Sequence, residues 1–205
     1  TPTPTPTPAT STRTLSDGST EFTDHELGYT LVLPPEWFLF SLGPEGMQAM
    51  IEAGAALNPE LAPLVESTAS YAAEGTRFMA FHPSPQALES GFPPSIVLIT
   101  LGDLGVPIDL LLEGTALSME STIPGAEVIS YEMIDDLNGQ PAGRVELRLP
   151  GATMYGTQVT ARATLTIIES AGQVLELLMQ CEESVFPEYQ SAFEDTIQSL
   201  TVVAP

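Results

Sequence analysis

The segment "AEVISYEMIDDLNGQPAGRVELRLPG", residues 126–151, predicts two β-strands joined by a tight turn. Asn138 and Gly139 stand between the two apolar-rich runs, and both residue types tolerate the positive φ angles of a two-residue hairpin loop. The next stretch, 157–169, alternates apolar with polar side chains, as a strand with two different faces does. These three strands predict an antiparallel sheet in the second half of the chain.

Further strands and helices are predicted on both sides of the hairpin. Apolar runs bounded by Pro, Gly or Ser predict strands within 28–34, 37–42, 76–83, 94–104 and 172–181, with a loop at 83–94. Helical spacing predicts a helical pair at about 44–74, a helix within 106–125 and a closing helix at 186–200. The closing helix places Phe186, Tyr189, Phe193, Ile197 and Leu200 on one stripe. This order predicts the α+β class, with a mainly antiparallel sheet covered by helices.

The charge of the chain excludes two classes of partner. Its 205 residues include 27 acidic side chains but only five basic ones, all arginine, for a net charge of −22. Nucleic acids and anionic membrane surfaces are bound largely through Lys and Arg. We therefore expect no nucleic-acid partner, and membrane association only through an anchor upstream of Thr1.

The first residues, "TPTPTPTPATSTRT", predict a linker rather than part of the core. Proline at every second position prevents helix formation and favours an extended, semi-rigid spacer. We expect residues 1–20 to be a disordered linker and 21–205 to be one domain. Spacers of this composition commonly hold a domain away from a surface, so we expect an extracytoplasmic location and a targeting segment that has been removed.

Three quoted segments together resemble the PsbP-like and Mog-like superfamily, which includes bacterial surface lipoproteins. They are "GYTLVLPPEW" (28–37), "LNGQPAGRVEL" (137–147) and "GQVLELLMQCEESVFPEYQSAFEDTIQSL" (172–200). The resemblance implies an α/β/α sandwich around the sheet, and binding or assembly roles without shared catalytic residues. It also implies that Trp37 seals the core against the sheet edge. The alternative for this residue is an exposed platform that stacks on a ligand.

No enzyme signature is present in the sequence, and we expect no catalytic residue, cofactor or metal site. His25 and His82 are far apart in sequence, and acidic neighbours would raise the pKa of the Cys181 thiol. An enzyme of unrecognised type would require His82, Cys181 and a carboxylate to share one cleft. The segment "IDDLNGQ" (134–140) lacks the ligand spacing of a calcium loop and fits a solvated turn.

Arg144, Arg148 and Arg162 are the first candidate ligand-binding residues. If strands 126–149 and 157–169 are neighbours, the three guanidinium groups gather on one sheet face. They then form either an anion-recognising patch or a lattice neutralised by Glu132 and Glu146. The sequence leaves both arrangements open.

Met47 and Met50 are the second candidates. On the 44–74 helices they form either an adaptable lid over an apolar groove or an ordinary packed pair.

The composition and the resemblance together predict a non-catalytic binding or assembly domain, a monomer whose partner is an unidentified protein or small molecule. The alternative is a carrier of a small apolar or anionic ligand, held between the 44–74 helices and the sheet.

Overall fold

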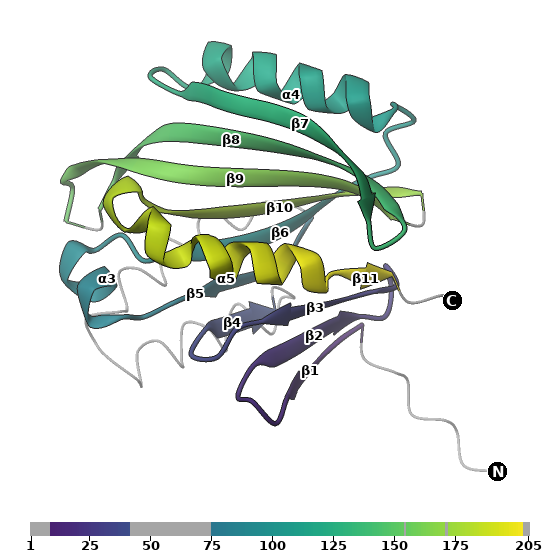
Figure 1. The fold of residues 1–205 in the computed structure, drawn as a ribbon, viewed down its shortest axis with the longest axis horizontal. Helices are drawn as coiled ribbons and strands as arrows, with labels where there is room; N and C mark the ends of the chain where they lie inside the picture. Colours follow the sequence, from purple (N-terminus) through teal and green to yellow (C-terminus); the bar gives the residue numbers. More distant parts are fainter. Residues whose placement is uncertain (1–8, 42–74, 154, 171, 203–205) are drawn as a thin grey trace.

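The computed structural model describes residues 9–41, 75–153, 155–170 and 172–202, and within these ranges it shows an α+β fold built on antiparallel sheets (Figure 1). The larger sheet has the strand order β4-β5-β6-β10-β9-β8-β7. Its strands are β4 (Phe38–Ser41), β5 (Thr76–Phe81), β6 (Ser95–Gly102), β7 (Glu127–Leu137), β8 (Gln140–Ala152), β9 (Gln158–Ser170) and β10 (Gln173–Glu182).

The smaller sheet has the order β1-β2-β3-β11, formed by β1 (Thr10–Thr14), β2 (Thr20–Asp24), β3 (Tyr29–Leu33) and β11 (Thr201–Val202). The helices among the described residues are α3 (Pro85–Ser90), α4 (Ile108–Thr122) and α5 (Phe186–Ser199), the last preceded by a 3-10 turn at Glu183–Val185. Every strand pairing in the two sheets is antiparallel. The predicted α+β class and mainly antiparallel pairing are confirmed.

The β7–β8 hairpin forms at the predicted turn. Asn138 and Gly139 adopt φ angles of 53° and 86°, and the flanking Leu137 and Gln140 pair directly. The Asn138 side-chain amide also donates to the carbonyl oxygens of Gln198 and Leu200, each at 2.7 Å. The turn residue thereby satisfies carbonyl groups at the end of α5, which have no partner within the helix.

The larger sheet is covered on both faces. Leu112 of α4 packs over Gly143 of β8, where a Cβ atom would lie 2.9 Å from Leu112 Cδ1. Phe193 and Ile197 of α5 pack with the smaller sheet against the opposite face. Because α5 covers that face, Thr166 of β9, predicted on the polar side of its strand, is fully buried.

The predicted boundary of the N-terminal linker is wrong. Residues 10–14 form β1, which pairs with β2 over its whole length, with Arg13 and Glu21 in contact at 3.0 Å. Threonine favours strands because its branched side chain packs well on a pleated surface. The first eight residues, which contain the Thr-Pro repeat, lie outside the described residues.

Two other predictions concern connections. The helical pair at 44–74, with Met47 and Met50, lies outside the described residues. The loop predicted at 83–94 contains α3, whose cap was visible in the sequence. Ser84 accepts a hydrogen bond from the Ala87 amide, Pro85 begins the helix, and Gly91 ends it at φ 70°.

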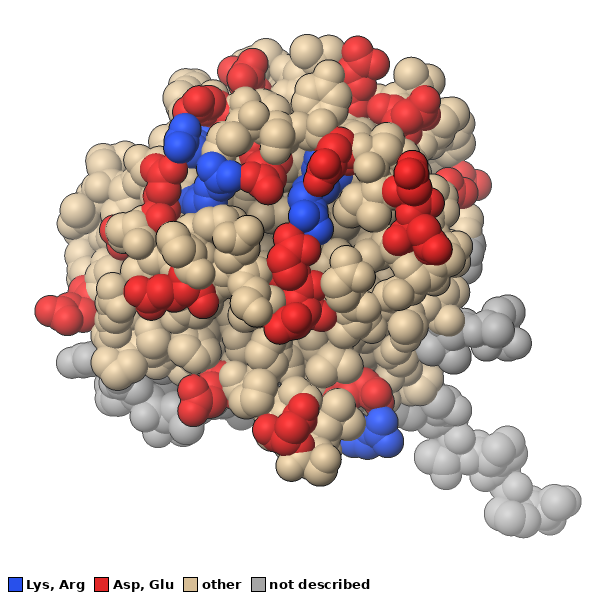
Figure 2. Space-filling model, viewed as in Figure 1, with Lys and Arg blue, Asp and Glu red and all other residues tan. Residues whose placement is uncertain are grey.

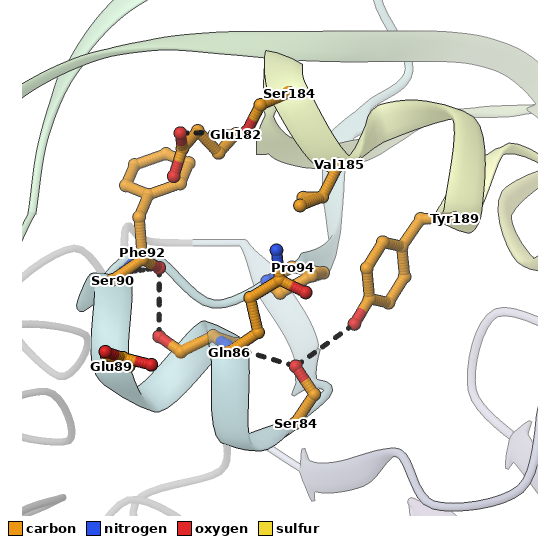
Figure 3. A pocket seen from close by; sticks show the side chains of 11 residues that line it. Ser84, Gln86, Glu89, Ser90, Phe92, Pro94, Glu182, Ser184, Val185 and Tyr189 are labelled. Atoms are coloured by element: carbon orange, nitrogen blue, oxygen red, sulfur yellow. Dashed lines mark hydrogen bonds between the residues drawn. The ribbon is translucent and has the colours of Figure 1, made fainter.

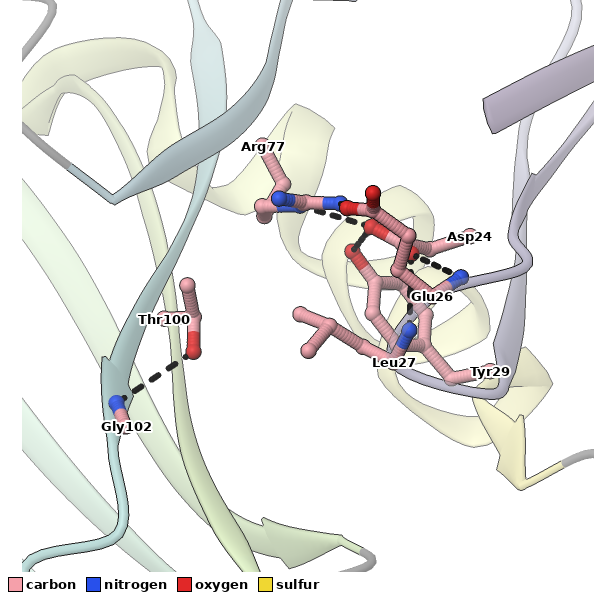
Figure 4. A network of polar contacts seen from close by, with 7 residues as sticks. All are labelled: Asp24, Glu26, Leu27, Tyr29, Arg77, Thr100 and Gly102. Carbon is pink, nitrogen blue, oxygen red and sulfur yellow. Dashed lines mark hydrogen bonds and ion pairs between the residues drawn. The ribbon is translucent and has the colours of Figure 1, made fainter. Parts of the chain in front are cut away.

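A buried polar cluster joins the two sheets, and we call Asp24, Glu26, Tyr29 and Arg77 the Asp24 network (Figure 4). The fully buried Asp24 carboxylate accepts hydrogen bonds from the amides of Glu26 (3.0 Å) and Leu27 (2.9 Å). Arg77 of β5 reaches it from the larger sheet with Nε at 2.7 Å. Burial and the nearby Asp24 charge raise the pKa of Tyr29, which stays neutral.

Candidate functional site

The structure brings Arg144, Arg148 and Arg162 to one face of the larger sheet. Arg148 of β8 lies directly opposite Arg162 of β9, and Arg144 is on the same side of β8 four residues earlier. This is the face on which α5 lies, because Cys181, which pairs with Arg162, belongs to the core under α5. We call these three residues the arginine face.

Each guanidinium of the arginine face is paired with a carboxylate. Arg144 contacts Glu194 of α5 at 2.9 Å, and Arg162 contacts Glu146. Two like charges opposite each other in a sheet repel, so Arg148 and Arg162 need such partners.

Arg148 takes two partners, Glu183 at 2.5 Å and Glu127 at 3.1 Å. The hydrogen bonds that Arg148 donates to these two carboxylates raise the pKa of its guanidinium. The guanidinium of Arg162 also lies 5.2 Å from the centre of the Phe186 ring on α5. The arrangement is therefore the neutralised lattice. Of its two expected acidic members only Glu146 forms an ion pair there, because α5 supplies Glu194 in place of Glu132.

The two remaining arginines are paired as well, Arg13 with Glu21 and Arg77 with Asp24 and Glu26. In Figure 2 the basic side chains on this face touch acidic ones, and acidic groups spread over the rest of the view. An anionic ligand would have to displace one of these carboxylates.

A pocket of about 280 Å³ lies between α3 and the segment from Glu182 to Tyr189 (Figure 3). Neither α3 nor this pocket was predicted. It is lined by Ser84, Gln86, Ala87, Glu89, Ser90, Phe92, Pro94, Glu182, Ser184, Val185 and Tyr189. Among the described residues, its charged lining consists of the two glutamates.

Trp37 and His82 hold one wall of this pocket. The indole is 7% exposed and packs against the rings of His82, Tyr189 and Phe193, with centroids 5.7, 6.3 and 6.1 Å away. The expectation that Trp37 is mostly buried is confirmed. His82 Nδ1 lies 2.9 Å from the Tyr189 hydroxyl, which in turn donates to Ser84 Oγ at 3.4 Å.

Glu36 completes this group from the solvent side. Its carboxylate lies 3.7 Å from His82 Nε2, and its backbone adopts φ 71° directly after Pro34-Pro35. A positive φ at a residue other than Gly, Asn or Asp is uncommon and costs free energy. We call Glu36, Trp37, His82, Tyr189 and Ser84 the Trp37 brace.

Cys181 is fully buried, and burial with the charges of Glu182 and Glu188 raises the pKa of its thiol to about 12. A thiol in this state is a poor nucleophile. In the "IDDLNGQ" turn, the Asp136 carboxylate accepts the Gly139 amide and Asn138 is used by α5. Within the described ranges no group of three or more His, Cys, Asp or Glu residues is placed to hold a metal ion.

Sequence comparison identifies no relative: no protein-family model and no curated protein matches this chain. Comparison of folds does find similar structures. PsbP of the cyanobacterium Synechocystis sp. PCC 6803 (CyanoP) aligns at TM-score 0.55 and 14% identity, over 91% of this chain and 93% of its own. The Ran-binding protein Mog1p of Saccharomyces cerevisiae aligns at TM-score 0.51 and 11% identity, over 92% and 97%. The chain therefore has the PsbP/Mog-like fold that the sequence resembles.

No helix among the described residues is long and apolar enough to cross a membrane.

Proposed function

We propose that this chain is a non-catalytic binding or assembly domain that works outside the cytoplasm, as a monomer tethered to a cell surface. The Thr-Pro spacer and the acidic, lysine-free composition support the location. The similarity in fold to a protein described as Ran-binding is compatible with a binding role. We also propose the α/β/α sandwich, supported by α4 and α5 on opposite faces of the larger sheet, and the surface-lipoprotein branch, supported by the Thr-Pro spacer.

The observation that carries the non-catalytic part is the state of the reactive side chains. The Cys181 thiol is buried with a raised pKa. His82 is held by Tyr189 and lies near Glu36. Every arginine is engaged by a carboxylate, so none is free to stabilise a developing negative charge.

Cell fractionation of the native, full-length gene product tests the location. We expect the protein in the surface or membrane fraction, released by cleavage in the Thr-Pro segment. Recovery of the native protein in the cytosol would contradict the proposed location and tether. Turnover of ester or amide substrates that is lost in His82→Gln would contradict the non-catalytic assignment.

A small-molecule carrier is the second candidate, and the pocket beside α3 is the observation that favours it. The groove first expected for a ligand, between the 44–74 helices and the sheet, lies outside the described residues. Native mass spectrometry of the purified protein tests this candidate. A bound small molecule would support a carrier, whereas the bare chain mass in every preparation would favour a protein partner.

A further inference from the structure

We infer that the pocket between α3 and Glu182–Tyr189 binds a positively charged group, an ammonium or guanidinium carried on a short apolar stem. The inference rests on the binding role proposed above and names the chemistry of its ligand. The sequence left open an anion-recognising arginine patch and a small apolar or anionic ligand, and the inferred ligand has the opposite charge to the anionic one.

The charges in the pocket favour a cation. Glu182 enters from the end of β10 and Glu89 from α3, and no basic side chain lines the space between them. The hydroxyl of Ser184 donates to the Glu182 carboxylate at 2.9 Å, which fixes the orientation of this carboxylate. A cation entering the pocket would meet two carboxylates from two different elements, and charge-assisted hydrogen bonds are the strong ones.

The rest of the protein also favours a cation at this place. All five arginines are paired elsewhere in the fold, so no mobile guanidinium is left to neutralise the pocket. The net charge of −22 attracts cations and repels anions over the whole surface. This long-range attraction is diffuse and does not by itself select the pocket.

The side chains that line the pocket make it selective for a cation on an apolar stem. Phe92, Pro94, Val185 and the ring of Tyr189 give apolar surface for a stem (Figure 3). Aromatic ring faces also attract cations directly, and the ring of Tyr189 is one of the two in this pocket. The hydroxyl oxygen of Ser90 accepts one hydrogen bond, from the Phe92 amide, and keeps a second lone pair for an N–H donor.

The Trp37 brace fixes the Tyr189 wall before any ligand arrives. The phenolic hydroxyl is held between His82 and Ser84, and the indole of Trp37 packs edge to face with the ring at 88°. Because the ring is already ordered, binding does not have to immobilise it. Glu36 lies at the far end of the brace, with its carboxylate 3.7 Å from His82 Nε2.

The test is an NMR titration of the full chain with n-butylammonium, with butyrate as the anionic match of the same length. We expect saturable amide shifts at residues 84–92 and 182–189 with butylammonium, and none with butyrate. Glu182→Gln removes the charge but keeps the shape, and should weaken binding about tenfold, as expected for loss of one charged hydrogen bond. Glu89→Gln should weaken binding in the same direction.

Glu113→Gln is the matched control, because Glu113 is an exposed glutamate on α4 outside the pocket. It should leave the affinity within about twofold, since it changes only the screened long-range field. Equal weakening by Glu113→Gln and Glu182→Gln would overturn the inference in favour of diffuse attraction. Shifts that do not saturate, or stronger binding of butyrate, would overturn it as well.

A second titration separates the two sources of such a group. The peptide acetyl-Gly-Lys-Gly-amide presents the same ammonium as the side chain of a protein partner. Tighter binding of the peptide indicates a lysine on a partner protein, and tighter binding of butylammonium indicates a free amine. If the protein is found at the cell surface but the titration fails, only the proposed cationic ligand is refuted. If the protein is cytosolic but the titration succeeds, only the proposed tether is refuted.

Discussion

Removing the charge of Asp24 should destabilise the domain more than removing any other single charge of the Asp24 network. The carboxylate is fully buried and accepts two backbone amides and Arg77 Nε. Breaking a buried ion pair by removing one partner typically costs about 3–5 kcal/mol. Arg77 keeps Glu26 at 2.8 Å, which places the pair at the lower end of that range.

The two backbone amides that donate to Asp24 make the cost of a substitution depend on whether an acceptor for them remains. Asp24→Asn keeps the side-chain oxygen that accepts them, but it loses the charge and replaces the oxygen that accepts Arg77 Nε with an NH2 group, so we expect a loss of about 2–3 kcal/mol. Asp24→Ala also leaves both amides without an acceptor, at about 0.5–1.5 kcal/mol each, for a total of about 4 kcal/mol. That is a large part of the 5–15 kcal/mol by which domains are usually stable.

The assay is urea unfolding followed by Trp37 fluorescence, with the free energy of unfolding extrapolated to water. Glu26→Gln is the matched control, because Glu26 binds the same arginine but is 60% exposed, and it should cost less than about 1 kcal/mol. A double-mutant cycle of Asp24→Asn with Arg77→Met should give a coupling of at least about 1 kcal/mol. Additive effects, or an Asp24→Ala cost equal to that of Glu26→Gln, would refute the role of this pair in joining the sheets.

Three further predictions concern single residues. Asn138→Gly keeps the positive φ but loses two hydrogen bonds to the end of α5, and it should cost about 1–2 kcal/mol of unfolding free energy. Asn138→Ala should cost about 1 kcal/mol more, because alanine resists that φ. Equal costs in urea unfolding would contradict this. Cys181 should react with a thiol reagent only at the rate of unfolding, so fast labelling of the native protein at pH 8 would be incompatible with its buried position. Burial raises the pKa of Glu176, so the folded state binds the proton of this carboxyl group more tightly than the unfolded chain does. The stability that this group contributes is therefore present below its unfolded-state pKa, and it is lost as the pH rises through its folded-state pKa. Glu176→Gln should therefore raise the melting temperature at pH 7 but not at pH 3, with Glu113→Gln unchanged at both, and a shift of equal size at the two pH values would argue against desolvation.

Local signals in the sequence were sufficient for most of the elements. The Asn138-Gly139 turn, the alternation Tyr29, Leu31 and Leu33 in β3, and the aromatic stripe of α5 each follow from a rule that concerns neighbouring residues. The linker boundary was placed too late because residues 10–14 become a strand only by pairing with β2. A threonine-rich segment can be either a linker or a strand, and it becomes a strand only when a partner strand pairs with it.

The candidate site was harder to predict because its parts are distant in sequence. Sheet register placed Arg144, Arg148 and Arg162 together, and this was foreseeable from the strand order. Glu146, the partner of Arg162, was foreseeable as well, but Glu194 and Glu183 were not, because they come from α5 and the turn before it. The same holds for the Asp24 network, in which Arg77 is 53 residues from its partner.

The sequence by itself determined the α+β class, the order of most strands and helices in the described ranges, and a negative surface, because periodicity, turn chemistry and charge are local or additive properties. It did not predict β1, β2, α3 and β11. Only the tertiary structure decided which charges remain free. Close packing brought each of the five arginines against a carboxylate, and it placed Glu89, which forms no ion pair within the described residues, in the same pocket as Glu182 and Tyr189. Ion pairing depends on distances of a few ångströms between distant segments, and no count of residues contains those distances.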